Sequence, residues 1–159
     1  MKRALCFAIP LVFAGAPVWA AQSNGNAALA LAAQIGAEDP ALSAQQKSVL
    51  TYFLNSQTNV ALPAGVRSLT VKADKITCRM GDVDIGLHAC TLAFGAKTVT
   101  KSGAAGQMLL ATMQENGVPS DGAAGTIFYN ATAVSCTIDA TQVESHDGGG
   151  AKCTFANGS

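Results

Sequence analysis

The stretch Ala73-Asp74-Lys75-Ile76-Thr77-Cys78 has the same pattern as Ala131-Thr132-Ala133-Val134-Ser135-Cys136, which lies 58 positions later. Both follow A-x-x-[IV]-[ST]-C. Each cysteine is followed by a second one that opens a related tripeptide, Cys90-Thr91-Leu92 or Cys153-Thr154-Phe155, with Ala next. We therefore predict two copies of one unit, each ending in a pair of strands that a disulfide joins.

The N-terminus has the features of a secretory signal peptide. Lys2-Arg3 supplies positive charge, an apolar stretch over 4–16 follows, and Val18-Trp19-Ala20 offers small residues at the −3 and −1 positions of a cleavage site. We place the cut after Ala20, and Ala14-Gly15-Ala16 is a weaker second site. The apolar stretch is short for a membrane span, so we expect a cleaved signal over 1–20 and a periplasmic or secreted product.

The charge of the mature chain is weak. Removing the signal takes two of the ten basic residues, which leaves eight against ten acidic residues and a net charge near −2. This balance gives no electrostatic basis for binding nucleic acid or an anionic membrane surface. We expect no nucleic-acid partner and no membrane insertion after signal cleavage.

The cysteines predict two disulfides. Cys6 lies in the predicted signal, and the four that remain in an exported chain most naturally pair with one another. Three pairings are possible, and the repeated pattern selects Cys78–Cys90 and Cys136–Cys153. A zinc site is the alternative, but the sequence lacks the C-x-x-C spacing of the usual zinc-binding loops. We expect no metal and no cofactor.

Two helices have clear start or stop signals. Ser43 and Gln46 form the S-x-x-Q capping-box pattern before an apolar helical stripe. Ser102 is placed to cap a helix that ends near Gly117. Residues 121–134 are ambiguous: their apolar spacing favours a helix, although Thr126-Ile127-Phe128-Tyr129 has strand propensity. We expect a loose helix over 27–35, a helix over 121–134, and strands over 66–80, 87–94, 97–101, 134–139 and 152–156.

These elements predict an α+β fold. Tandem helix-plus-antiparallel-hairpin units would form an antiparallel sheet with helices packed on one face, held by two disulfides. The layout resembles that of secreted β-lactamase-inhibitor proteins, and the resemblance is one of fold alone. We expect 21–40 to be a flexible or loosely helical segment, and 41–159 to be one compact domain of two pseudo-repeats, 41–101 and 102–159.

Candidate catalytic groups lack a supporting context. The two histidines are His88, on the apolar face of a predicted strand, and His146, in a Gly-rich connection. We interpret both as non-catalytic, and the chain has no G-x-S-x-G or S-x-x-K motif. A carboxylate pair for glycoside hydrolysis would have to come from turn residues, where carboxylates are usually hydrated. The candidates are Asp82, Asp84, Asp139, Glu144 and Asp147.

We therefore expect a protein that is not an enzyme. Tyr52, Tyr129 and His88 are the candidate interface residues, since tyrosine anchors many interfaces, whereas Phe53 and Phe128 are expected in the core. The favoured function is a non-catalytic binding or inhibitor-like module of the bacterial envelope or extracellular space, with a protein or another envelope macromolecule as partner. Two alternatives stay open: a small periplasmic hydrolase using His88 or a carboxylate pair, and a self-associating structural envelope protein.

Overall fold

The computed structural model describes residues 20–56, 68–81, 88–123, 126–139 and 150–157. Within these ranges the chain forms three helices and one seven-stranded antiparallel sheet. In chain order the elements are β1 (Ala20–Asn24), α1 (Gly25–Gly36), α2 (Ala44–Ser56), β2 (Ser68–Met80), β3 (His88–Phe94), β4 (Lys97–Ser102), α3 (Gly103–Glu115), β5 (Ser120–Ala123), β6 (Thr126–Asp139) and β7 (Ala151–Asn157).

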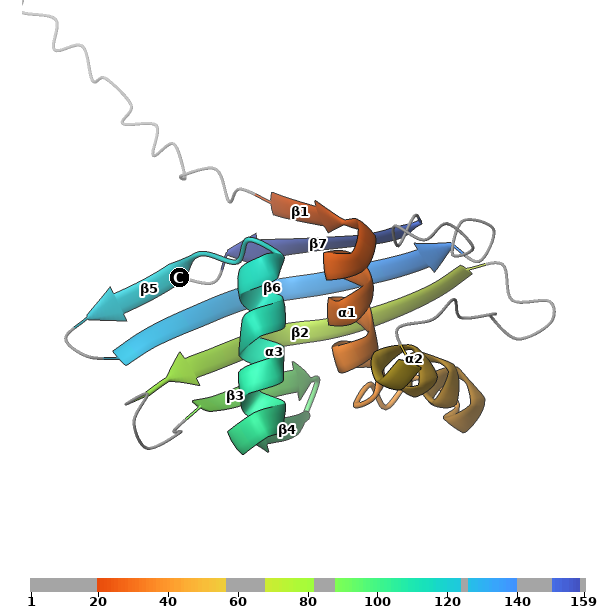
Figure 1. The fold of residues 1–159 in the computed structure, drawn as a ribbon, viewed down its shortest axis with the longest axis horizontal. Coiled ribbons are helices and arrows are strands. Elements are labelled where there is room, and N and C mark those ends of the chain that lie inside the picture. The colour runs from red at the N-terminus through yellow and green to blue at the C-terminus, as the bar shows by residue number, and fades with distance from the viewer. Residues whose placement is uncertain (1–19, 57–67, 82–87, 124–125, 140–149, 158–159) are drawn as a thin grey trace, which may run out of the picture.

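The molecule has two layers. Helices α1 and α3 lie side by side across one face of the sheet, and α2 packs against α1 (Figure 1). The apolar side chains of the strands point toward these helices and form the core with them, which includes Leu31, Ile76, Leu109 and Phe155. This confirms the predicted α+β fold with helices on one face of an antiparallel sheet.

The sheet is arranged symmetrically about its central pair of strands, with two further strands on each side. β2 and β6 pair in the middle, β3 then β4 continue from β2, and β7 then β1 continue from β6. Both edge strands, β1 and β4, lead through a glycine with positive φ into a helix: Gly25 (φ 70°) begins α1 and Gly103 (φ 59°) begins α3. β5 pairs with the first part of β6, beyond the end of β7.

Both predicted disulfides are confirmed. Cys78 on β2 lies directly opposite Cys90 on β3, and Cys136 on β6 lies directly opposite Cys153 on β7, with Cα–Cα distances of 4.0 Å in both pairs. All four cysteines are fully buried under the helices. The sulfur of Cys153 lies 3.2 Å from the carbonyl oxygen of Ala28 in α1.

The same packing recurs at the other disulfide. The sulfur of Cys90 lies 3.3 Å from the carbonyl oxygen of Gly106, which is the fourth residue of α3 as Ala28 is of α1. A Cβ built on Gly106 would lie 2.7 Å from the carbonyl oxygens of both His88 and Lys101. Glycine is therefore needed at this position, because α3 touches the backbones of β3 and β4 there.

The helix expected over 121–134 is wrong. These residues form β5 and the first part of β6, which pair antiparallel with one another. The register of β6 with β7 shifts between Thr132 and Ser135, and Ala133 has φ 49°. This bulge moves the buried face from Tyr129 and Ala131 to Val134 and Cys136. The bulge interrupts the alternation of apolar residues, because the buried Ala131 and Val134 are three positions apart. This spacing is typical of one face of a helix.

The N-terminal segment belongs to the same core as the rest of the chain. The helix expected over 27–35 is α1, and most of its residues from Ala28 to Gly36 are buried. β1 pairs with β7 at the edge of the sheet, so 21–40 contributes to the fold of 41–159. The capping box of α2 is confirmed, because the Ser43 N–H donates to Gln46 Oε1 at 2.8 Å and the Gln46 N–H donates to Ser43 Oγ at 3.2 Å.

Candidate functional site

Two of the three candidate interface residues lie in the core. His88 is 9% exposed and Tyr129 is 8% exposed, because both side chains point to the helix-covered face of the sheet. The Tyr129 hydroxyl accepts a hydrogen bond from Gln114 Nε2 of α3 at 2.7 Å. The Nδ1 atom of His88 is buried without a hydrogen-bond partner in the part of the chain that the structure describes. No described carboxylate or hydroxyl therefore orients His88 through Nδ1.

The other candidates fall largely outside the described residues. Tyr52 belongs to α2, but its side chain and that of Phe53 lie outside the described part of the structure. The same holds for His146 and for the carboxylates of Asp82, Asp84, Glu144 and Asp147. Asp139 lies at the end of β6, where its N–H donates to the carbonyl of Gly150 at 3.0 Å.

The described residues offer neither a metal site nor a helix suited to span a membrane. No group of three or more His, Cys, Asp or Glu side chains is placed there to hold a metal ion. None of the described helices combines the length and the apolar character that a bilayer crossing requires.

None of the described helices lies on the second face of the sheet, which we call the open face (Figure 1). Its side chains are exposed or half-buried and are mostly hydroxyl-bearing or charged, with one large apolar residue. Alternation along each strand and the printed registers place them on one surface. Among the described residues, the open face includes Gln22, Asn24, Ser68, Thr70, Lys72, Lys75, Thr77, Arg79, Ala89, Thr91, Ala93, Thr98, Thr100, Ser102, Asp121, Phe128, Asn130, Thr132, Ser135, Thr137, Asp139, Lys152, Thr154 and Ala156.

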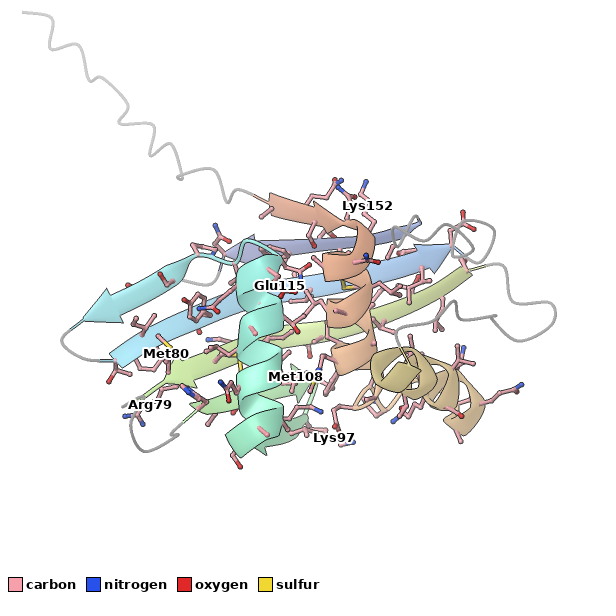
Figure 2. The ribbon with its side chains drawn as sticks, in the orientation of Figure 1. Arg79, Met80, Lys97, Met108, Glu115 and Lys152 are labelled. Carbon is pink, nitrogen blue, oxygen red and sulfur yellow. A yellow bond between two sulfur atoms is a disulfide. The ribbon has the colours of Figure 1, made fainter. Side chains whose placement is uncertain are left out.

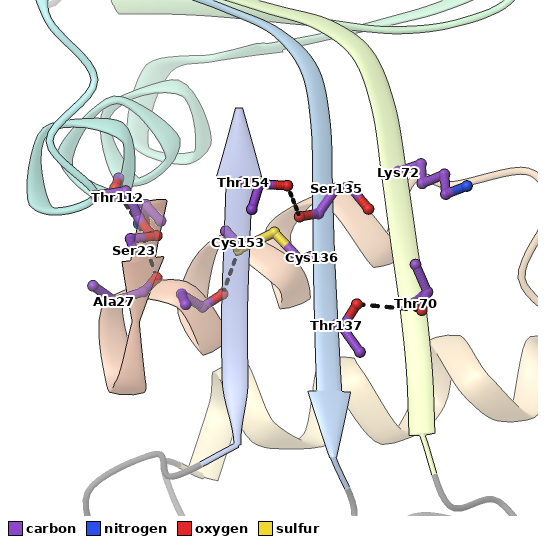
Figure 3. The surroundings of a disulfide bond; sticks show 12 residues. Ser23, Ala27, Thr70, Lys72, Thr112, Ser135, Cys136, Thr137, Cys153 and Thr154 are labelled. Atoms are coloured by element: carbon purple, nitrogen blue, oxygen red, sulfur yellow. Dashed lines mark hydrogen bonds between the residues drawn. A yellow bond between two sulfur atoms is a disulfide. The ribbon is translucent and has the colours of Figure 1, made fainter. Parts of the chain in front are cut away.

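Hydroxyl pairs across the strands hold part of this surface in place. Thr70 Oγ1 and Thr137 Oγ1 are 3.5 Å apart, and the Thr154 hydroxyl donates to the Ser135 carbonyl at 3.4 Å (Figure 3). At the other edge of the sheet, Thr91 Oγ1 lies 3.3 Å from Thr100 Oγ1. These groups satisfy one another across neighbouring strands, as cross-strand threonine pairs commonly do.

The exposed aromatic residue of the open face is Phe128. Its side chain is 37% exposed, although the sequence pattern places it in the core. Phe128 on β6 pairs directly with Arg79 on β2 and with Asp121 on β5, and both neighbours are exposed. We call these three residues the Phe128 row. Arg79 lies at one end of β2, beside Met80 (Figure 2).

The described residues supply no opposite charge in contact with either charged residue of the Phe128 row. Neither Arg79 nor Asp121 has an ion-pair partner among the described residues. The ion pair Lys101–Glu38, with Nζ 2.8 Å from Oε1, lies on the helix side, where it joins β4 to the end of α1. The row therefore combines an exposed arginine and an exposed aromatic ring, which are side-chain types enriched in interfaces, with an exposed carboxylate.

Sequence reasoning missed the Phe128 row because it read residues 121–134 as a helix. The strand propensity of Thr126-Ile127-Phe128-Tyr129 was the available signal. If that stretch is a strand with Tyr129 buried, Phe128 must point to the opposite face. Comparison with protein-family models, curated proteins and solved structures found no match to this chain.

Proposed function

We propose that the protein is a non-catalytic binding module of the bacterial envelope or extracellular space that engages a macromolecular partner through the open face. The observation that carries this proposal is the Phe128 row. A large aromatic side chain is exposed between Arg79 and Asp121 on a sheet whose other face packs against the helices. Aromatic side chains and arginine are enriched at the centres of protein interfaces.

The rigidity of the open face supports this role. It is built on the central strands β2 and β6, and each of them is tied to its outer neighbour by a buried disulfide. A surface on paired strands loses little conformational entropy when it binds, so more of the contact energy contributes to affinity.

The proposed compartment follows from the same disulfides. Paired cysteines persist in oxidising environments, which include the periplasm and the extracellular space. Within this proposal, residues 1–20 act as a cleaved signal, and export would allow Cys78–Cys90 and Cys136–Cys153 to form. The mirrored strand order and the equivalent contacts of Ala28 and Gly106 support a duplicated unit as the origin of the fold.

Affinity capture with matched variants tests the proposal. The bait is oxidised protein, exported from the full-length chain, in three forms: wild type, Phe128→Ser and Met108→Ser. Met108 is the matched control because it is the other large apolar residue exposed in the described structure, at 56%, and it lies on the outer side of α3 (Figure 2). Reduced and alkylated bait controls for binding to unfolded chain.

The expected result is a partner retained by the wild type and by Met108→Ser and lost by Phe128→Ser. A partner retained equally by both variants, or lost only from Met108→Ser, would show that the open face is not the binding surface. Near-identical thermal unfolding of the two variants would establish that the difference arises at the surface, since both side chains are exposed.

A further inference from the structure

The charges of the Phe128 row are arranged in an order that is complementary to itself. Arg79, Phe128 and Asp121 lie directly opposite one another on three adjacent strands. Neighbouring strands are about 4.8 Å apart, so the cation and the anion are separated by about 10 Å, with the ring midway. When a second copy is rotated by 180° about an axis parallel to the strands, its open face presents Asp121, Phe128 and Arg79 in the reverse order.

This reversal determines which twofold axis brings opposite charges together. Two sheets that pack face to face lie about 10 Å apart with their strands within about 30° of each other. An axis that runs along β6 places Phe128 against the Phe128 of a second copy and Arg79 against the Asp121 of that copy. An axis that runs along the row instead brings two Arg79 side chains together.

The cations of the open face fit the same axis, which places one anion, Asp139 at the end of β6, against its own copy. Besides Arg79, these cations are Lys72 and Lys75 on β2, on one side of β6, and Lys152 on β7, on the other side. Most open-face residues of β6 are flanked by one residue on β2 and one on β5 or β7. The twofold rotation about β6 places the β2 residue of one copy opposite the β5 or β7 residue of the other. The facing pairs are Arg79 with Asp121, Lys75 with Ala156, Lys72 with Thr154, and Thr70 with Lys152, so no cation directly faces another.

A twofold axis along the neighbouring strand β2 would bring cations face to face. It would place Lys72, Lys75 and Arg79 each against its own copy, and like charges brought face to face disfavour association. The weak net charge of the mature chain adds little long-range repulsion between copies.

We propose that a second copy of this chain binds the open face in an isologous dimer whose twofold axis runs along β6 and whose centre is the Phe128 row. This inference rests on the proposed function in one respect, that the open face is a binding surface, and it names the partner. The dimer forms two symmetric Arg79–Asp121 contacts, and burial of two Phe128 rings between them supplies the apolar part of the interface.

Charge reversal and sedimentation velocity over a wide protein concentration range test the dimer. Arg79→Asp and Asp121→Arg should each weaken self-association by roughly tenfold or more, because each change places two like-charged pairs in the interface. Phe128→Ser should weaken it as well. Lys152→Asp is the matched control, since it reverses a charge on the same face, far from the Phe128 row, and leaves dimerisation in place.

Two rescue measurements make the test specific. The double variant Arg79→Asp with Asp121→Arg should dimerise as the wild type does. An equimolar mixture of the two single variants should form a heterodimer, because every contact across that interface then joins opposite charges. A general loss of folding could produce neither rescue.

A wild-type protein that stays monomeric throughout the concentration range overturns the dimer, and so does a dimer that both charge reversals leave unchanged. These failures are distinct from failure of the proposed function. A monomeric wild type that captures a different macromolecule in a Phe128-dependent manner keeps the open face as a binding surface and removes the second copy as its occupant.

Discussion

Replacement of Gly106 by alanine tests the closest contact between the helices and the sheet. A Cβ on Gly106 would lie 2.7 Å from two backbone oxygens, those of His88 and Lys101. Both oxygens belong to paired strands and cannot move aside as the end of a flexible side chain can. Helix α3 would therefore have to move away by about 0.7 Å to restore an ordinary contact distance of 3.4 Å.

The expected magnitude is the balance of two opposing effects. Alanine favours a helix over glycine by about 1 kcal/mol. Overpacking of a close contact typically costs about 1 to 3 kcal/mol. The shift of α3 also withdraws the Gly106 carbonyl from the Cys90 sulfur and loosens the packing of the buried Leu109 and Met113. We expect Gly106→Ala to lower the free energy of unfolding by about 1 to 2 kcal/mol, or roughly 4 to 8 °C in Tm.

Urea unfolding followed by circular dichroism measures this change, with two controls. Gly122→Ala should leave stability within about 0.5 kcal/mol, because its added Cβ has no neighbour closer than 3.7 Å. Ala111→Gly, at an exposed position of α3, reports the helix-propensity contribution alone and should cost about 1 kcal/mol. The reasoning is refuted if Gly106→Ala stabilises the protein by about 1 kcal/mol, as alanine does where a helix glycine faces open space.

Four further perturbations should have distinct effects on stability. Replacing Cys78 and Cys90 together by alanine should lower the free energy of unfolding by about 2 to 4 kcal/mol in denaturant titrations, and a loss below about 0.5 kcal/mol would contradict a structural role for this disulfide. Ala133→Gly should raise Tm, with a gain of up to about 1 kcal/mol, because φ is 49° there; a decrease would argue against the bulge. Asn116→Ala should lower the free energy of unfolding by about 1 to 3 kcal/mol, since the buried Asn116 amide donates to two carbonyls. Lys101→Ala should lower it by less than about 1 kcal/mol, because it removes only a partly exposed ion pair. Equal losses for the two variants in calorimetry would contradict this distinction.

The features that the sequence predicted are those encoded locally. The capping box of Ser43 and Gln46 needs only a four-residue span, and both of its hydrogen bonds form. The disulfide pairing was predictable because each bridge joins neighbouring strands of one hairpin, so that Cys78 needs only Cys90. Ser102 occupies the N-cap position of α3 as expected, although its side chain donates or accepts no capping hydrogen bond.

What the sequence could not predict depends on contacts between distant segments. β1 has only five residues and no apolar alternation, and it is a strand because β7 pairs with it. The bulge at Ala133 hid the alternation of β6 and, with it, the exposure of Phe128. On β2 the buried side likewise changes between Ala73 and Ile76, with Asp74 and Lys75 both exposed between them. A period-two search across either site finds two short patterns in place of one long strand.

These long-range contacts are reciprocal between the two ends of the chain. α1 covers Cys153, and α3 covers Cys90, so each helix shields the disulfide formed in the other half of the chain. Side chains just after each helix also contact the other end of the chain. Asn116, after α3, accepts a hydrogen bond from Ser23 on β1, and Glu38, after α1, forms an ion pair with Lys101 on β4.

These contacts between the two halves of the chain determine how the halves fold. When the two halves are divided between β3 and β4, as 20–94 and 97–157, each edge strand completes the sheet of the opposite half, because β1 pairs with β7 and β4 pairs with β3. A half on its own would keep its disulfide but would leave it without the helix that covers it, and would leave one strand edge unpaired. Burial of apolar surface is the main favourable contribution to folding. Both halves must therefore fold together, which holds β2 and β6 side by side and makes the open face a single continuous surface.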